Sequence, residues 1–267
     1  MANLPNAPLV YTLGVAHFPA IPNPHHFASL FHEAIRAEYP HYQHITLPQV
    51  SVTAGPEGLK LEQHLSPIWQ FSAPDRSWAF ILTPALLAIH TVAYSTHGDF
   101  IDRLRHGLSR LLAVDGIGIS YVGAVGVRYV DRVIPREGEV LSDYLKEFVL
   151  PPEFSGLADL KLEEGVYVSR YSTPDGDLRF QVLRNPPAVL PPELETALTQ
   201  QNGWKFDRPS GSFAVVDIDY GARFEPPKPM DVDFVCDRVL RLRGRAKAVF
   251  ENIGTSHAMS VWNEKRS

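Results

Sequence analysis

The sequence predicts an α+β fold in which three longer helices cover one large, curved antiparallel sheet, built from two related halves. Two observations carry this prediction. Short apolar strand patterns follow one another across turns of only a few residues, which is typical of antiparallel neighbours because a parallel crossover needs a dozen residues or more. Three longer segments instead repeat apolar residues at steps of three and four, the period of a helix with one buried face.

The first strand is predicted over residues 8–18, where two sets of side chains alternate. Leu9, Tyr11, Leu13, Val15 and His17 form the set richer in large apolar groups, so this set is expected to face the core. The first helix follows over residues 25–39. Asn23-Pro24 is read there as a cap followed by a proline at the first helical position.

The next elements are short and closely spaced, as in an antiparallel meander. Strands are expected at residues 41–53, 68–72, 77–82 and 86–94, with a helix at 98–113 and a long strand at 118–134. Thr96 is the predicted cap of that helix because its hydroxyl can accept a hydrogen bond from a free backbone N–H of the first turn. Trp69, Trp78, Phe71 and Phe80 alternate in strands as core residues do.

Two prolines, Pro151 and Pro152, mark the predicted boundary between the halves. The N-terminal half comprises residues 1–150 and the C-terminal half residues 151–267. The second half is expected to contain, in order, a hairpin of strands 166–172 and 178–183, a short helix 191–201, a strand 213–220 and a helix 230–255, with a short helix 141–148 before it. Pro226, Pro227 and Pro229 are taken to separate the last strand from the last helix.

The C-terminal helix has the clearest pattern in the chain. Its apolar stripe is Val232, Val235, Val239, Leu242, Ala246, Val249 and Ile253. Its opposite surface carries Arg238, Arg241, Arg243, Arg245 and Lys247. The pattern favours a helix packed along a sheet with a solvated basic face, and a coiled-coil seam or an anion-binding face are the alternatives.

The composition excludes several classes of protein. The chain has 267 residues, 45% hydrophobic and 21% charged, and a net charge of -5, so a nucleic acid or an anionic membrane is disfavoured as a partner. The single cysteine, Cys236, excludes an intrachain disulfide and a cysteine-rich zinc site. The sequence contains neither a secretory signal pattern nor a long apolar run, and a cytoplasmic location is expected.

Histidines and aspartates are the candidate metal ligands. Seven of the eleven histidines precede residue 65, but their spacing does not match a zinc motif, and surface histidines are the favoured interpretation. Asp217 and Asp219 share one strand face and are weak candidates for a Mg²⁺ site. The favoured alternative is pairing with a cation of a neighbouring strand. No metal and no cofactor are predicted.

The charged end of the long strand is the candidate binding site. Arg128 and Arg132 share one face of this strand, and Tyr129 and Asp131 share the other. These four residues are predicted to bind a ligand or a partner, with the arginines contacting an anion. A structural ion pair linking the two halves is an equally weighted alternative.

The chain resembles a sporadically distributed bacterial family of uncharacterised proteins. The matching segments are Asn6-Ala7-Pro8-Leu9-Val10, Phe18-Pro19, Tyr39-Pro40, Trp69-Gln70-Phe71-Ser72, Val125-Gly126-Val127-Arg128-Tyr129-Val130-Asp131-Arg132 and Phe250-Glu251-Asn252-Ile253-Gly254-Thr255. The most specific is the Gly-Val-Arg-Tyr-Val-Asp-Arg strand. The resemblance implies no catalytic residues, and it implies a mobile or defence-related gene neighbourhood only by association.

Three functions remain open from the sequence. The first is a non-enzymatic interaction or regulatory protein that binds a protein partner or forms a homodimer. The second is a binding module for a small molecule or anion, lodged between sheet and helix. The third is a Mg²⁺-dependent hydrolase or nuclease that uses Asp217 and Asp219. An enzyme is the less favoured class because no nucleophile or phosphate-loop motif occurs.

Overall fold

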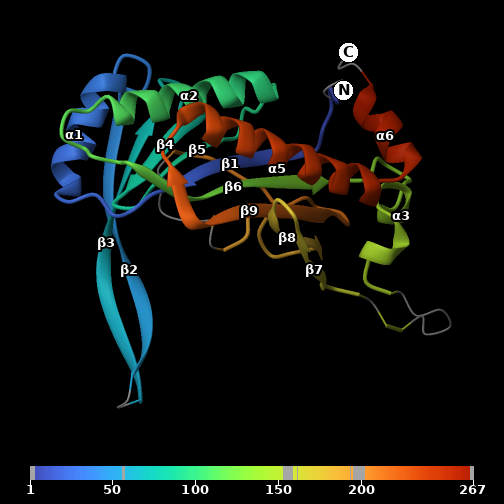
Figure 1. Cartoon of the computed structure of the whole chain (residues 1–267). Coiled ribbons are helices and arrows are strands. Elements are labelled where there is room, and N and C mark those ends of the chain that lie inside the picture. The colour runs from blue at the N-terminus through green and yellow to red at the C-terminus, as the bar shows by residue number, and fades with distance from the viewer. Residues whose placement is uncertain are drawn as a thin grey trace.

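One nine-stranded antiparallel sheet organises the chain in the computed structural model (Figure 1). The structure describes residues 4–55, 58–152, 159–160, 162–192, 194 and 202–264. The strand order is β2-β3-β4-β5-β1-β6-β9-β8-β7, so β2 and β7 are its edges. The strands are β1 (Leu9–His17), β2 (His41–Gly55), β3 (Gly58–Ser72), β4 (Trp78–Thr83), β5 (Leu86–Thr91), β6 (Tyr121–Val133), β7 (Gly165–Thr173), β8 (Gly176–Arg184) and β9 (Ala214–Pro229). The predicted mixed fold with a large antiparallel sheet is confirmed.

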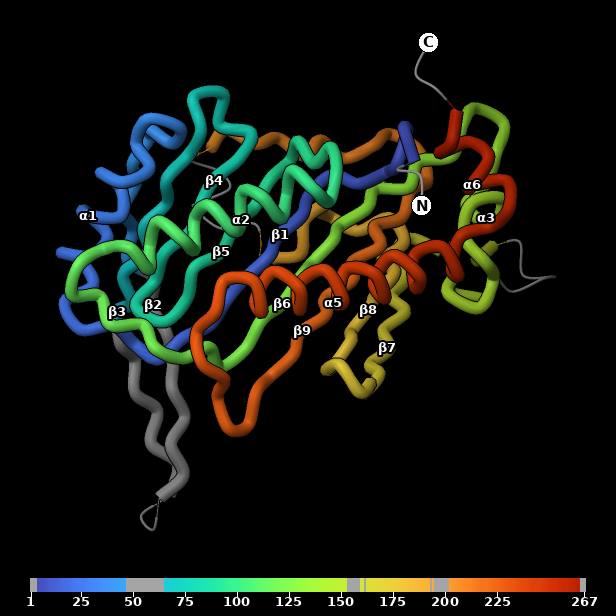
Figure 2. Tube along the Cα trace, turned by 45° about the horizontal axis from the view of Figure 1, so that its top comes forward, coloured from blue at the N-terminus to red at the C-terminus, as the bar shows by residue number. Residues whose placement is uncertain are grey.

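The helices lie mainly on one face of this sheet. They are α1 (Pro24–Ile35), α2 (His97–Leu112), α3 (Leu141–Tyr144), α5 (Val232–Ile253) and α6 (Ser256–Asn263), with a 3-10 turn, η1, at Glu147–Val149. Figure 2 shows α2 and α5 side by side across the strands, with α1 beyond one end of α2. None of the described helices combines the length and the apolar character that crossing a membrane requires.

Two apolar clusters lie on opposite faces of the sheet. The larger one joins α1, α2 and α5 to the strands, and the predicted core aromatics Trp69, Phe71, Trp78 and Phe80 all belong to it. The smaller cluster lies on the other face, where the residues that follow β8 and those that precede β9 cover the strands. Its members are Tyr11, Val130, Val189, Leu190, Phe213 and Val215. We call the face with the larger cluster the helix face of the sheet and the face with the smaller cluster the loop face.

The prediction for β1 was wrong about which side chains meet the main core. Ala16 faces the helices, and Gly14 lies so close to Phe100 of α2 that a Cβ there would be 2.9 Å from the ring. The larger residues Tyr11 and Leu13 belong to the loop-face cluster instead. A bulky helix side chain needs a small strand residue beneath it, so the face with less apolar volume is the one that α2 covers.

The three prolines expected to end the last strand lie inside it. β9 continues to Pro229, and Tyr121 and Val122 of β6 still pair with Pro229 and Lys228. The pairing of β9 with β8 stops at Gly221. Beyond that point β9 has a described neighbour on one side only, so a missing proline N–H costs no ladder hydrogen bond on the other side.

Of the two predicted helix caps, Thr96 is confirmed and Asn23 is not. Asn23 precedes α1 with a left-handed backbone, φ 48°, and its side chain makes no capping hydrogen bond, although Pro24 does begin the helix. Thr96 accepts a hydrogen bond from the Asp99 N–H as predicted. Asp231 and Thr255 cap α5 and α6 in the same way.

The helix expected at residues 191–201 falls largely outside the described residues.

Gly107 lets α2 approach the sheet. A Cβ at this position would collide with the ring of Phe80. We expect Gly107→Ala to lower the free energy of unfolding by about 1–3 kcal/mol through overpacking, although alanine is the better helix former. The matched control is Gly244→Ala on α5, where nothing lies within 4 Å of the new methyl group. This variant should be stabilised by about 0.5–1 kcal/mol, and urea denaturation of both variants measures the contrast.

Candidate functional site

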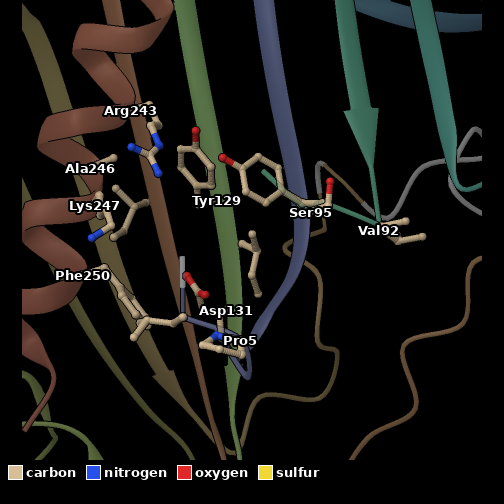
Figure 3. Close-up of a pocket in the computed structure, with 15 residues that line it drawn as sticks. Pro5, Val92, Ser95, Tyr129, Asp131, Arg243, Ala246, Lys247 and Phe250 are labelled. Carbon is tan, nitrogen blue, oxygen red and sulfur yellow. The ribbon is translucent and has the colours of Figure 1, made fainter. Parts of the chain in front are cut away.

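A cavity of about 470 Å³ lies between α5 and the helix face of the sheet (Figure 3). Its floor comes from β6 and β9, one wall from α5, and the other wall from the N-terminal segment and the chain after β5. The lining residues are Leu4, Pro5, Ala7, Leu9, Val92, Ala93, Tyr94, Ser95, Tyr129, Asp131, Ile218, Arg243, Ala246, Lys247 and Phe250. This size suits a small organic molecule.

The alternation of β6 places two of the four predicted site residues in this cavity. Tyr129 and Asp131 point into it from the strand, whereas Arg128 and Arg132 lie on the loop face. A register shift in β1, between Leu9 and Tyr11, occurs where β1 pairs with this part of β6. Such a bulge re-aims side chains beside a site, and here Leu9 lines the cavity while Tyr11 faces away.

Asp131 is a buried carboxyl group that has no partner among the described side chains. Its exposed fraction is 5%, and it forms no hydrogen bond or ion pair with another described residue. Burial, and secondarily the negative charge of Asp217, raise the pKa of Asp131 to about 8. The side chain is therefore mostly protonated at neutral pH, and it offers the cavity an O–H donor as well as an acceptor oxygen.

Arg243 and the two tyrosines form another polar group along the cavity. Tyr94 and Tyr129 meet edge to face, with ring centroids 6.2 Å apart. Burial raises the pKa of both phenols, and the positive charge of Arg243 acts in the opposite direction on both. Arg243 forms no ion pair with a described residue. Figure 3 shows its guanidinium group directed toward Tyr129.

The cation of Lys247 is already engaged. Lys247 forms an ion pair with Glu251 one turn later on α5, and its side chain is 18% exposed. Its partly buried position places the aliphatic stem along the cavity wall. The available cation of this wall is therefore Arg243.

The N-terminal wall is held in place by α6 and the residue that follows it. The Asn6 N–H donates to the Trp262 carbonyl oxygen at 2.9 Å, and the Asn6 side-chain amide donates to the Glu264 carbonyl oxygen at 2.6 Å. These two hydrogen bonds place the described segment before β1 against α6 and the residue that follows it. The cavity is thus closed by contacts between segments that are far apart in the sequence.

Arg128 forms a buried ion pair rather than a cavity contact. Its Nε and Nη2 atoms donate to the two carboxylate oxygens of Asp217 at 2.8 and 2.7 Å. Gln181 donates to the same carboxylate at 2.7 Å. The pair joins β6 to β9, as expected of an ion pair linking the two halves of the sequence. Arg132 donates to the Asp207 carbonyl oxygen at 2.9 Å.

The pairing of Asp217 bears on the proposed Mg²⁺ site. Both of its oxygens accept hydrogen bonds from side chains, and its exposed fraction is 1%. No group of three or more histidine, cysteine, aspartate or glutamate side chains in the described part of the chain could hold a metal ion. Among the N-terminal histidines, His25 and His44 pack against Trp69, and the side chain of His64 lies outside the description.

A polar chain crosses the loop face beside this ion pair. The Tyr11 hydroxyl donates to His90 Nδ1, and His90 Nε2 donates to the Gln70 side-chain oxygen, both at 3.1 Å. Gln70 Nε2 donates to the side-chain oxygens of Gln43 and Asn202, both at 3.0 Å. Because His90 is fully buried, its pKa is lowered to about 3, and the neutral ring is the form that this chain of donors and acceptors requires.

The buried neutral His90 should make the protein sensitive to acid. Below pH 6.5 an unfolded histidine gains a proton that the native ring does not take up until about pH 3. The unfolded state then binds more protons, so the free energy of unfolding falls as pH falls through this interval, by at most about 1.4 kcal/mol per pH unit. We expect His90→Gln to remove this slope in urea denaturation between pH 6.5 and 4, and the exposed control His97→Gln to keep it.

Sequence patterns did not identify Arg243 and Tyr94 as site residues. Arg243 was grouped with the solvated basic face of the C-terminal helix, but it lies at the border between that face and the apolar stripe. A long side chain at such a border can extend over the buried face. The position of Arg243 at the border of the apolar stripe is the sequence feature that could have identified it as a site residue.

Comparisons of this chain with protein-family models, with curated proteins and with solved structures find no match. The resemblance to a bacterial family stays a prediction.

Proposed function

We propose that this protein is a non-enzymatic binding module for a small organic acid, which occupies the cavity between α5 and the sheet. This is the sequence-predicted ligand-binding function with a different cation, Arg243, in place of Arg128 and Arg132. The observation that carries the proposal is a pair of polar groups within one cavity that form no ion pair with any described residue: the carboxyl of Asp131 and the guanidinium of Arg243.

The lining defines the chemistry of the ligand. Leu9, Ile218, Ala246 and Phe250 provide apolar surface for a hydrocarbon body. Arg243 provides the donors that bind a carboxylate in a bidentate manner. Both groups are needed, because an inorganic anion would leave the apolar part of a 470 Å³ cavity unfilled.

Asp131 favours a second polar group on the ligand. Figure 3 shows the Arg243 guanidinium beside Tyr129 and the Asp131 carboxyl farther along β6, toward Pro5. An acid held at Arg243 can therefore extend toward Asp131. A hydroxyl or carbonyl oxygen at its far end would exchange a hydrogen bond with the protonated carboxyl.

The test is calorimetry with a defined panel of acids. Benzoate, 4-hydroxybenzoate, 3-phenylpropanoate and octanoate would be titrated into the full chain, with benzamide as the neutral comparison. We expect saturable 1:1 binding of at least one acid and none of the amide. Arg243→Gln should weaken the binding at least tenfold, because a charge-assisted hydrogen bond contributes about 1.5–3 kcal/mol.

Arg241→Gln is the matched control, since Arg241 is exposed on the same helix outside the cavity. It should bind the acid as the unmodified protein does. Absence of saturable binding for the whole panel, or equal affinity in Arg243→Gln, would contradict the proposed function.

A role in protein association is supported by a separate observation. β7 is an edge of the sheet, and Val166 and Val168 on its loop-face side are 62% and 48% exposed. Two copies of this strand can pair antiparallel across a two-fold axis, which satisfies both open edges. Sedimentation at increasing concentration should then show a dimer that Val168→Lys abolishes, and a concentration-independent monomer mass would contradict this role.

A further inference from the structure

The loop face of the sheet also carries an open trough. The trough lies outside the area that the loop-face cluster covers. The trough has a volume of about 730 Å³ and lies over β1, β6, β9, β8 and β7. It is separate from the cavity beneath α5, because the sheet lies between them. Its floor and its charged rim point to a different ligand.

The floor of the trough is formed by two glycines. Gly126 of β6 and Gly221 of β9 are register partners, with Val15 of β1 beside Gly126. A Cβ at Gly221 would have only the Val125 carbonyl oxygen within 4 Å, at 3.7 Å, which is an ordinary contact. Packing within the chain therefore does not require glycine at position 221, whereas a Cβ at Gly126 would lie 3.2 Å from Val15 Cγ1. Glycine inside a strand often marks the close approach of another group to the backbone.

Three arginines surround this floor. Arg170 and Arg179 are directly opposite each other on β7 and β8, and Arg223 lies two residues beyond Gly221 on β9. None of the three forms an ion pair with any described residue, although Arg179 donates to the Gln181 side-chain oxygen at 2.9 Å. Like charges directly opposite on neighbouring strands repel, so an anion between them would stabilise the arrangement.

Other charged groups complete the rim. His17 and Arg223 both line this end of the trough, and burial and then the charge of Arg223 lower the pKa of His17. Asp177 accepts a hydrogen bond from the Ser172 hydroxyl at 3.0 Å. Asp219 stands opposite both Arg128 and Arg179 in register. The arginines thus outnumber the carboxylates, and Arg170 and Arg223 lie at different sides of the glycine floor.

We propose that this trough binds a phosphorylated small molecule, with its phosphoryl oxygens held by Arg170, Arg179 and Arg223 above Gly126 and Gly221. A phosphoryl group suits the site because it has several charged oxygens, and guanidinium groups bind such oxygens in a bidentate manner. From strand spacing, Arg170 and Arg223 are about 16 Å apart at the backbone, so their long side chains can reach one ligand above the glycines. Asp177 can accept a hydrogen bond from a hydroxyl or amino group of the organic part.

The experiment titrates inorganic pyrophosphate into the full chain by calorimetry at low salt and without divalent cations. We expect saturable 1:1 binding. Arg170→Gln and Arg223→Gln should each weaken it at least tenfold, whereas Arg241→Gln on the outer surface of α5 should leave it unchanged. Gly221→Val places a side chain on the floor, and it should abolish binding while leaving the thermal unfolding midpoint unchanged or higher, since valine favours strands.

Each outcome decides the proposal. No saturable heat up to about 1 mM pyrophosphate, or equal weakening by Arg241→Gln and the trough variants, would overturn it, because the second result indicates a general charge effect. Retained binding in Gly221→Val would show that pyrophosphate does not bind above the two glycines. The organic acid panel reports on the cavity beneath α5 independently, since Arg243 lies on the other side of the sheet.

Discussion

Replacing Arg128 with methionine should lower the free energy of unfolding by about 3–5 kcal/mol. The exposed fraction of the Arg128 side chain is 8% and that of Asp217 is 1%. Removing the guanidinium leaves a buried carboxylate whose one remaining hydrogen bond from a described side chain is donated by Gln181. An unpaired buried charge is among the largest single causes of destabilisation.

Two further variants separate charge from packing. Arg132→Met changes the same residue type on the same face of β6, but Arg132 donates only to a backbone carbonyl at a more exposed position. It should change the free energy of unfolding by less than about 1 kcal/mol. The double variant Arg128→Met with Asp217→Leu should recover most of the loss, because two apolar groups can replace a buried ion pair.

Urea denaturation at neutral pH measures all three variants. A loss in Arg128→Met no greater than that in Arg132→Met would contradict the buried ion pair as a stabilising link. Equal losses in Arg128→Met and in the double variant would show that packing, rather than an unpaired carboxylate, sets the cost.

Asp131→Asn should stabilise the protein at neutral and higher pH. The pKa of Asp131 is about 8 in the native state, whereas the ordinary pKa of an aspartate, which applies to the unfolded state, is 3.8. Between these values the native state holds a proton that the unfolded state has lost, so the free energy of unfolding falls as pH rises from about 4 to 8. The burial cost of this carboxyl is on the order of 4 kcal/mol at pH 7, and a neutral amide avoids the pH-dependent part.

The measurement is urea denaturation at pH 4, 6 and 8. The difference between Asp131→Asn and the unmodified protein should be small at pH 4 and should grow with pH. Asp115→Asn is the control, because Asp115 is exposed in the turn after α2, and its effect should stay within about 0.5 kcal/mol. Parallel pH profiles for Asp131→Asn and the unmodified protein would show that Asp131 is not held protonated in the native state.

Such a stabilising substitution would also bear on function. Buried carboxyl groups that lower the free energy of unfolding of the protein are common at binding and catalytic sites. The same Asp131→Asn variant can be titrated with the bound acid. A gain in stability together with weaker binding would link the cost of Asp131 to its ligand.

Part of this architecture follows from local sequence alone. The stripe from Val235 to Ile253 predicted the long helix α5, because helical periodicity is a local property. Strand alternation likewise separated Tyr129 and Asp131 from Arg128 and Arg132, since successive side chains of any strand point to opposite faces.

Only the tertiary structure decided what each face meets. Alternation did not say that the helices would cover Gly14 and Ala16 of β1 rather than Tyr11, nor that Arg128 would meet Asp217, 89 residues later. The cavity joins Asp131 to Arg243 of α5 and to a wall held by contacts between the two ends of the chain. These relations depend on strand register and helix placement, which many distant contacts fix together and no local pattern encodes.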